Sequence, residues 1–179
     1  IMADGTLKVG TITNSAGSGN IAIGSGVTLL SNTPSLKVIR ATSNQTGISS
    51  GTATKIQFNS EDSLTTDGTW DSTNYRWTPG VAGKYLISIN TELYPESSTA
   101  KQCNVYIYKN GSSICYGYLN MNDMYLRSGG AQAFGAVTID TATATDYYEG
   151  FVYMQTNSGT VAVRADDDNT NLIAYKLGI

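Results

Sequence analysis

Residues 70–93 read W-D-S-T-N-Y-R-W-T-P-G-V-A-G-K-Y-L-I-S-I-N-T-E-L and decide the fold class of this chain. Two tryptophans and a tyrosine precede a Pro-Gly turn, and a segment with strictly alternating side chains follows it. Its two faces hold Tyr85, Ile87, Ile89 and Leu93 on one side and Leu86, Ser88 and Asn90 on the other. Because side chains alternate with a period of two in a strand, this stretch predicts a β-sheet rather than a catalytic motif.

The composition of the 179-residue chain argues against several classes of function. Only 14% of the residues are charged and the formal net charge is -3, without a cluster of Lys and Arg, so nucleic acid is not an expected partner. The chain has no histidine, which excludes Ser-His and Cys-His mechanisms. No apolar run reaches the roughly 20 residues of a membrane-spanning helix, and no signal peptide is recognisable. We therefore expect a protein that is not an enzyme, needs no cofactor and does not insert into membranes.

Strand-like segments recur along residues 34–179 at the spacing of a sandwich or barrel. No segment of ten or more residues shows a helical period of apolar residues. We predict an all-β head domain with ten strands, at residues 36–43, 54–59, 70–77, 84–94, 102–109, 113–119, 133–140, 146–156, 159–165 and 172–177.

Residues 1–33 differ from the head because they contain no aromatic side chain and only short β-branched runs between Ser/Gly turns. Such a segment has too little apolar mass to fold alone. It is either a linker or a strand-forming arm that becomes ordered against other chains, and the regular placing of Ile and Val favours the arm. The apolar residues predicted to mediate attachment are Ile12, Ile21, Ile23, Val27 and Leu29.

The dipeptide Asn110-Gly111 predicts a hairpin with a two-residue type I′ turn. In that register the facing pairs are Lys109–Ser112, Ile107–Ile114, Tyr106–Cys115 and Cys103–Tyr118. Cys103 and Cys115 then lie on opposite faces of the ribbon, so we predict two free thiols.

Several predicted strands are apolar or aromatic on both faces. A monomeric sandwich usually has one solvated face per strand, so two-sided strands indicate a second buried surface between subunits. Tyrosine suits such a surface because its ring buries well and its hydroxyl stays polar. Tyrosines that simply line an exposed sheet are the alternative interpretation. The residues predicted for the subunit interface are Tyr106, Tyr108, Tyr148, Val152, Met154 and Tyr175.

Asp166, Asp167 and Asp168 form a concentrated carboxylate cluster between two predicted strands. Oxygen-rich loops suit Ca²⁺, which takes six to eight ligands. Three consecutive residues cannot all face one ion, however, and the spacing of a calcium-binding loop is absent. A solvated acidic turn is therefore the favoured interpretation, and a calcium site is the lesser alternative.

Aromatic residues in predicted loops are candidates for contact with a sugar or protein ligand. Tyr94, Tyr125 and Arg127 are the residues that we assign to this possible ligand surface. Packing within the subunit is an equally good explanation for each of the aromatic residues.

The order of these motifs resembles the globular head of complement subcomponent q and the related tumour-necrosis-factor-like jelly rolls. The segments that carry the resemblance are W-D-x3-Y-R-W at 70–77, T-P-G-V-A-G-K-Y-L-I-S-I at 78–89, V-Y-I-Y-K-N-G at 105–111, G-A-V-T-I-D at 135–140, A-T-D-Y-Y-E-G-F-V-Y at 144–153 and L-I-A-Y-K-L at 172–177. The resemblance implies a ten-stranded jelly roll that assembles as a tight homotrimer, with aromatic strand faces packed about the three-fold axis.

Two segments are similar to bacteriophage proteins in particular. A-T-D-Y-Y-E at 144–149, which departs from the usual Gly-Asp of the family, looks like forms found at the ends of virion proteins. Residues 6–29 are similar to amino-terminal segments of phage fibre and decoration proteins. These similarities imply a trimer on the virion surface, attached through its arm to the capsid or another virion protein as a decoration or head-fibre protein. The alternative is a tail-fibre adhesin that recognises a host surface glycan or protein.

Overall fold

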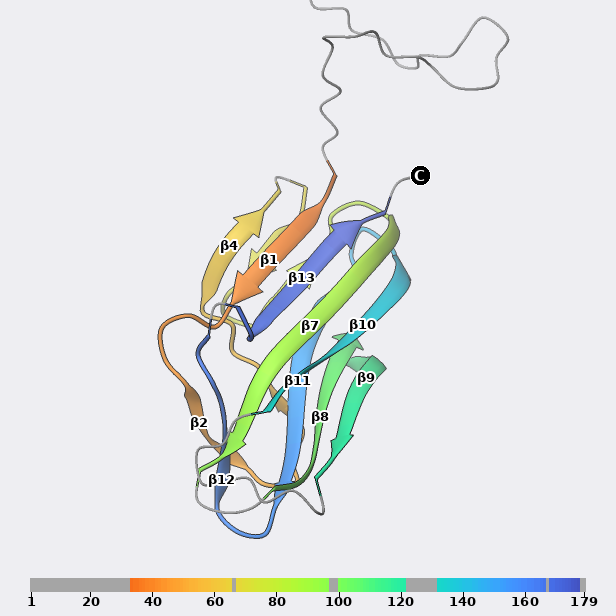
Figure 1. Ribbon diagram of the computed structural model, residues 1–179. Helices are drawn as coiled ribbons and strands as arrows, with labels where there is room; N and C mark the ends of the chain where they lie inside the picture. Colours follow the sequence, from red (N-terminus) through yellow and green to blue (C-terminus); the bar gives the residue numbers. More distant parts are fainter. Residues whose placement is uncertain (1–32, 66, 97–99, 122–131, 167, 178–179) are drawn as a thin grey trace, which may run out of the picture. The chain divides into compact units, whose positions relative to one another are not determined.

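The computed structural model describes residues 33–65, 67–96, 100–121, 132–166 and 168–177. Within them the chain forms thirteen strands in two antiparallel sheets that face each other (Figure 1). Among the described residues no helix has the length and hydrophobicity needed to cross a bilayer. The residues assigned to the attachment arm, Ile12, Ile21, Ile23, Val27 and Leu29, lie outside the described part of the chain.

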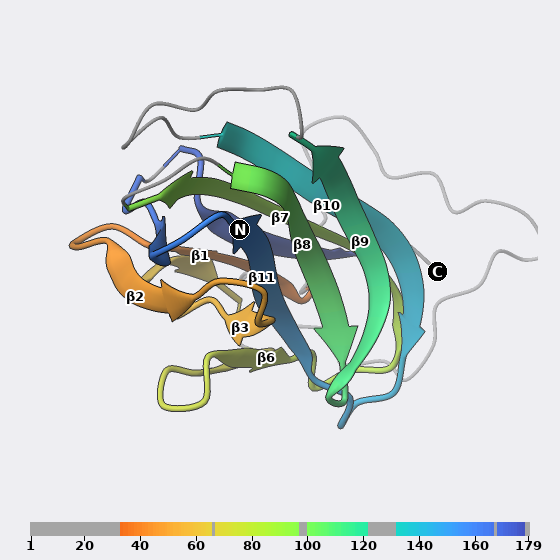
Figure 2. The ribbon, with the colours of Figure 1, turned by 90° about the horizontal axis from the view of Figure 1, so that it is seen from below.

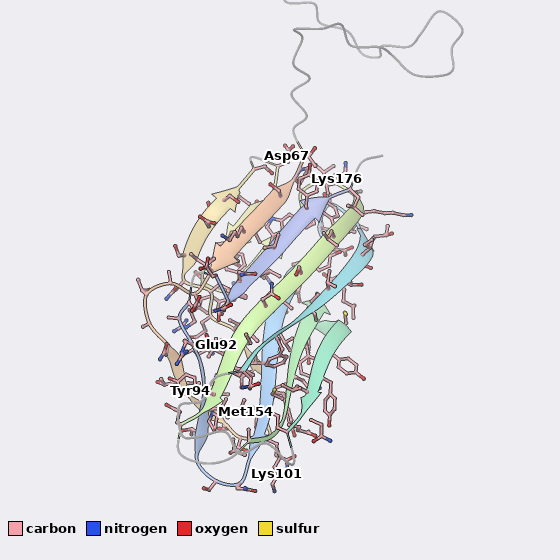
Figure 3. The ribbon with its side chains drawn as sticks, viewed as in Figure 1. Asp67, Glu92, Tyr94, Lys101, Met154 and Lys176 are labelled. Carbon is pink, nitrogen blue, oxygen red and sulfur yellow. The ribbon has the colours of Figure 1, made fainter. Side chains whose placement is uncertain are left out.

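The first sheet is built around β7, a long strand that pairs with β13 and β12 along one edge and with β10 along the other. Tyr94 of β7 and Lys176 of β13 lie at opposite ends of this sheet (Figure 3). Its strands are β1 (Ser35–Ile39), β2 (Gln45–Ser49), β4 (Ser60–Leu64), β7 (Gly83–Pro95), β10 (Gln132–Ala142), β12 (Thr160–Val163) and β13 (Asn171–Lys176).

The second sheet has the order β5-β6-β11-β8-β9, with the short β3 also paired to β11. Its outermost strand, β9, lies next to β10 of the first sheet, as the view from below shows (Figure 2). The Cys115 sulfur of β9 is 3.5 Å from the Val137 carbonyl oxygen of β10. The strands are β3 (Thr54–Lys55), β5 (Thr69–Asp71), β6 (Arg76–Thr78), β8 (Ala100–Lys109), β9 (Ser112–Asn120) and β11 (Tyr148–Thr156).

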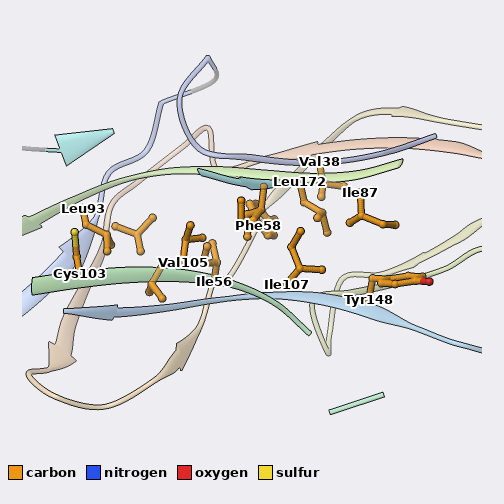
Figure 4. Packing of buried hydrophobic residues seen from close by; sticks show 14 of the residues in the cluster. Val38, Ile56, Phe58, Ile87, Leu93, Cys103, Val105, Ile107, Tyr148 and Leu172 are labelled. Atoms are coloured by element: carbon orange, nitrogen blue, oxygen red, sulfur yellow. The ribbon is translucent and has the colours of Figure 1, made fainter. Parts of the chain in front are cut away.

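The core lies between the two sheets (Figure 4). The predicted alternation of β7 is confirmed, since the four residues assigned to its apolar face are fully buried: Tyr85, Ile87, Ile89 and Leu93. Trp77 is also fully buried, with its ring 5.5 Å from that of Tyr85 and 6.2 Å from that of Tyr148.

Three residues predicted for the subunit interface belong instead to this core. Tyr148, Val152 and Met154 of β11 are at most 1% exposed and pack inside the single chain. These three residues share one face of β11, as alternation requires, but that face points into the core and not toward a neighbouring subunit. The face that points outward carries Phe151 and Tyr153.

The segment 70–77 is not one strand but the hairpin of β5 and β6. The Asp71 carboxylate accepts hydrogen bonds from the backbone N–H groups of Thr73 and Asn74, both at 3.0 Å, which reverses the chain. Tyr75 then adopts a left-handed backbone conformation with φ of 52° before β6 begins. An aspartate that bonds to the backbone two and three residues later is a typical turn former, so this turn was available in the sequence.

The hairpin at Asn110-Gly111 has the predicted turn but not the predicted register. Both residues have positive φ, 51° and 79°, as a type I′ turn requires, and Lys109 faces Ser112. A bulge at Ile114 then shifts the ladder by one residue. The facing pairs beyond it are Ile107–Cys115, Tyr106–Tyr116, Asn104–Tyr118 and Cys103–Leu119, in place of those expected.

Candidate functional site

The outer surface of the first sheet carries exposed apolar side chains from three neighbouring strands. Tyr175 of β13 faces Leu86 of β7, and Leu86 faces Ile139 of β10, so the three lie in one row. Ile173 and Val137 lie in the next row along the strands. We call this surface the aliphatic face; it consists of Leu86, Val137, Ile139, Ile173 and Tyr175.

The exposure of the aliphatic face is high for side chains with so few polar atoms. The exposed fractions are 37% for Leu86, 50% for Tyr175, 59% for Val137 and 61% for Ile139. One border of the face is charged, because Lys37 lies opposite Ile173 and its Nζ is 2.6 Å from the Asp62 carboxylate. A contiguous apolar patch with a polar rim is typical of a protein contact surface.

The outer surface of the second sheet is aromatic instead of aliphatic. Its cross-strand rows are Tyr153–Asn104–Tyr118 and Phe151–Tyr106–Tyr116, with Tyr108 two residues along β8. We call this surface the tyrosine face; it consists of Asn104, Tyr106, Tyr108, Tyr116, Tyr118, Phe151 and Tyr153.

The rings of the tyrosine face contact one another. Tyr106 has ring-centroid distances of 5.9 Å to Tyr116 and 6.0 Å to Tyr108. Tyr108 in turn stacks on Phe151 at 4.1 Å, and the Lys55 Nζ lies 5.6 Å from the Phe151 ring. These contacts hold the inner rings in place.

A groove of about 530 Å³ lies on this face, lined by Asn104, Tyr106, Tyr116 and Tyr118. Tyr116 and Tyr118 are 62% and 53% exposed, whereas Asn104 is only 7% exposed. Among the described residues, no hydrogen-bond partner is found for the Asn104 side-chain amide. Burial raises the pKa of Tyr106, and the neighbouring hydroxyls of Tyr108, Tyr153 and Tyr116 raise that pKa further.

The groove was missed at the sequence level because the predicted register turned Tyr116 and Tyr118 toward the core side of the ribbon. The bulge at Ile114 turns them outward and places Gly117 inward. A Cβ atom on Gly117 would overlap the carbonyl oxygen of Gly135 in β10, so that inward position requires glycine. The glycine in C-Y-G-Y-L was thus the signal that marks the inward positions.

The remaining predicted interface residues do not share a surface. Tyr106 and Tyr108 belong to the tyrosine face, while Tyr175 belongs to the aliphatic face on the other sheet.

Of the predicted ligand-contact residues, only Tyr94 lies within the described part of the chain, since Tyr125 and Arg127 fall outside it. The Tyr94 hydroxyl accepts a hydrogen bond of 2.8 Å from the Asn44 amide, and the Arg164 guanidinium lies 5.8 Å from its ring. Tyr94 is therefore packed among polar neighbours at the end of β7.

The acidic loop contains a turn stabilised by Asp166. Its carboxylate accepts the backbone N–H groups of Asp168 and Asn169, both at 3.0 Å, and these bonds lower the pKa of Asp166. Asp168 is exposed, and Asp167 lies outside the described residues. Within the described ranges, no group of three or more potential metal ligands is found.

Comparison with known proteins places the fold. No protein-family model matches the sequence, and no curated protein matches it. The structure of Eiger TNF from S. frugiperda aligns with a TM-score of 0.59 and 10% identity, over 83% of this chain and 94% of that chain. Murine APRIL aligns with a TM-score of 0.58 and 10% identity, over 81% of this chain and 99% of that chain. The predicted all-β class and jelly-roll resemblance are thereby confirmed: the chain has a tumour-necrosis-factor-like jelly-roll fold.

Proposed function

We propose that this chain is a non-enzymatic structural protein of a bacteriophage virion, a homotrimer whose jelly-roll head projects from the capsid as a decoration or head-fibre protein. The observation that supports self-association is the aliphatic face, where Tyr175, Leu86 and Ile139 form a continuous exposed row. The virion role is supported by the similarity of residues 6–29 and 144–149 to phage proteins.

The aliphatic face suits a permanent subunit contact better than the tyrosine face does. Leu86, Val137 and Ile139 have no side-chain polar atom and so form no hydrogen bonds with water. Burying them is favourable, since each buried methylene contributes about 0.8 kcal/mol to the free energy of association. Tyrosine hydroxyls keep their hydrogen bonds to water when exposed. The interface therefore centres on Tyr175 and its aliphatic neighbours, and Tyr106 and Tyr108 remain outside it. Three copies arranged about one axis would close the assembly.

A tail-fibre adhesin is the second candidate function. The observation that favours it is the tyrosine face, an exposed aromatic surface with a groove that the proposed trimer does not use. The two functions differ in where the protein sits. Antibody labelling of intact particles should mark the capsid at many copies for a decoration protein and the tail at few copies for an adhesin.

Sedimentation equilibrium of the full chain at micromolar concentration tests the trimer. We expect a mass about three times the chain mass of 19.0 kDa. A monomer would contradict the interface argument. Deletion of residues 1–33 should leave a trimeric head that no longer binds to particles lacking the protein, and binding that survives the deletion would remove the arm as the anchor.

A further inference from the structure

We propose that the groove on the tyrosine face is a binding site for a neutral saccharide, in which a sugar ring packs against Tyr116 and Tyr118 and its hydroxyl groups bond to Asn104. This site differs from the loop residues that the sequence indicated, and it lies entirely within one subunit.

The two exposed tyrosines supply a stacking surface. A pyranose ring has one face of C–H groups, and such a face packs favourably on an aromatic ring. The Tyr116 ring contacts Tyr106 in the same cross-strand row, and Tyr106 contacts Tyr108, so Tyr116 loses little side-chain freedom when a ligand binds. Exposed tyrosines are typical of recognition surfaces, because a tyrosine ring gives a large contact area at low cost in conformational entropy.

Asn104 supplies the polar group at the floor of the groove. Its amide offers two donors and one acceptor, and these atoms are not among the fully buried, unpartnered ones, so they keep contact with solvent in the groove, where a ligand can reach them. Tyr118 and Tyr153 lie opposite it on the two neighbouring strands, and both carry hydroxyls. A ligand hydroxyl both donates and accepts, so it can satisfy the amide where an apolar ligand cannot.

The charge of the site favours a neutral ligand. Among the described residues, no charged side chain lines the groove. The Lys55 ammonium group beside this face is already engaged, because it is 2.5 Å from the Glu149 carboxylate and lies over the Phe151 ring. An acidic sugar or a phosphate would therefore meet no positive charge from the four lining residues. The volume of about 530 Å³ falls within the usual range for small-ligand sites.

The groove and the aliphatic face lie on different sheets, so sugar binding does not depend on the proposed trimer. A result that contradicts the trimer would therefore not contradict sugar binding, and the reverse also holds. If the groove binds sugar, the adhesin function gains a specific site.

Saturation-transfer difference NMR with the full-length protein tests the site. The probes are the methyl glycosides of glucose, galactose, mannose and N-acetylglucosamine, each at millimolar concentration. We expect transfer to the ring C–H protons of at least one glycoside, and a shift of the Asn104 side-chain NH₂ signals in a ¹⁵N spectrum. The variant Tyr118→Ala should bind about tenfold more weakly, since a lost aromatic contact contributes on that order. Tyr118→Phe keeps the ring and should bind within about threefold of the parent protein.

The matched control is Tyr175→Ala, because Tyr175 and Tyr118 are similarly exposed, at 50% and 53%, but lie on different faces. Tyr175→Ala should retain sugar binding even if it dissociates the trimer. Asn104→Ala should lose binding with little change in melting temperature, because no hydrogen bond to the amide is found among the described residues. A purely structural Asn104 would instead lower the melting temperature. Absence of transfer from all four glycosides, or an affinity of folded Tyr118→Ala equal to that of the parent protein, would overturn the proposal.

Discussion

The Tyr148 hydroxyl donates a hydrogen bond of 2.6 Å to the Asp140 carboxylate, and this bond joins β11 of one sheet to β10 of the other. The Lys109 ammonium group donates to the same oxygen at 2.7 Å and lies 3.2 Å from Asp146. Asp146 also accepts a bond of 2.8 Å from the Asn110 amide. These hydrogen bonds and ion pairs form one polar cluster, which links the predicted Asn110-Gly111 turn to both sheets.

This cluster predicts a loss of stability in acid. The bonds from Asn110 and Thr143 lower the pKa of Asp146 to about 2. Burial raises the pKa of Asp140, but the bonds from Lys109 and Tyr148 outweigh it, so that pKa is also lowered. An unfolded aspartate has a pKa of about 3.9, so the stabilisation is complete above about pH 4 and is lost as the pH falls toward about 2.

Thermal melts between about pH 6 and pH 2 measure this effect, and Asp146→Asn isolates one carboxylate. At pH 6 we expect the variant to be less stable by about 1–3 kcal/mol, because hydrogen bonds to a charged group are lost. The deficit should shrink as the pH falls below about 4, because Asp146 then becomes protonated in the parent protein too. Asp62→Asn is the control, since the exposed ion pair with Lys37 contributes at most about 1 kcal/mol. A deficit independent of pH would show that the charge of Asp146 is not what stabilises the fold.

Two glycines with nearly the same backbone conformation allow a matched test of packing in the Pro-Gly turn. Gly80 has φ of 74° and Gly51 has φ of 75°. A Cβ on Gly80 would overlap the backbone carbonyl oxygen of Asp67, whereas a Cβ on Gly51 meets no atom within 4 Å. Gly51→Ala should cost about 1–2 kcal/mol, the usual penalty for a left-handed residue. Chemical denaturation should show a clearly larger loss for Gly80→Ala, and equal losses would mean that the turn adjusts around the methyl group.

The sequence predicted the buried face of a strand best where side-chain alternation alone determines it. The faces of β7 follow from alternation, because its central strand position forces one side chain in two into the core. The strands that were not predicted, β2 and β4, are the two ends of the first sheet's strand order. Strands at such edges can be polar throughout, as Ser60–Leu64 is for most of its length, so they carry no alternating signal.

The candidate surfaces were harder to predict because their assignment depends on register. One bulged residue, Ile114, reverses the orientation of Tyr116 and Tyr118, and apart from Gly117, which marks an inward position, no local pattern in β9 indicates that bulge. The assignment of Tyr148, Val152 and Met154 to a subunit contact was wrong for a related reason: both faces of β11 are apolar, and the sequence does not say which one meets the opposite sheet.

The cysteines give a prediction on reactivity. Both are free, but the register puts them on the same face of the ribbon, not on opposite faces as expected. Cys103 faces Leu119, four residues from Cys115, which separates the two along the strand by about 13 Å at the rise of a β-strand. A disulfide needs Cα atoms within about 7 Å, so no intramolecular bridge should form in the native state.

Burial also raises the pKa of the Cys103 thiol to about 12. Only thiolates react with alkylating reagents, so native protein treated with a maleimide should be labelled at Cys115, which is partly exposed, and at Cys103 only after unfolding. Peptide mass mapping with Cys103→Ser and Cys115→Ser as references assigns each label. The Cys103 sulfur lies 3.6 Å from the Met121 sulfur at one end of the core. Rapid labelling of Cys103 in the native protein would show that this end of the core opens readily.

Charge placed on either outer surface discriminates between the two possible subunit contacts. Ile139 of the aliphatic face and Tyr116 of the tyrosine face are 61% and 62% exposed, so lysine at either position is tolerated equally by an isolated subunit. If the aliphatic face forms the interface, Ile139→Lys buries unpaired like charges near the symmetry axis of three subunits, which is strongly unfavourable. We expect Ile139→Lys to sediment as a folded monomer and Tyr116→Lys to remain a trimer. The reverse result would move the subunit contact to the tyrosine face, and a trimer in both variants would place it on neither surface.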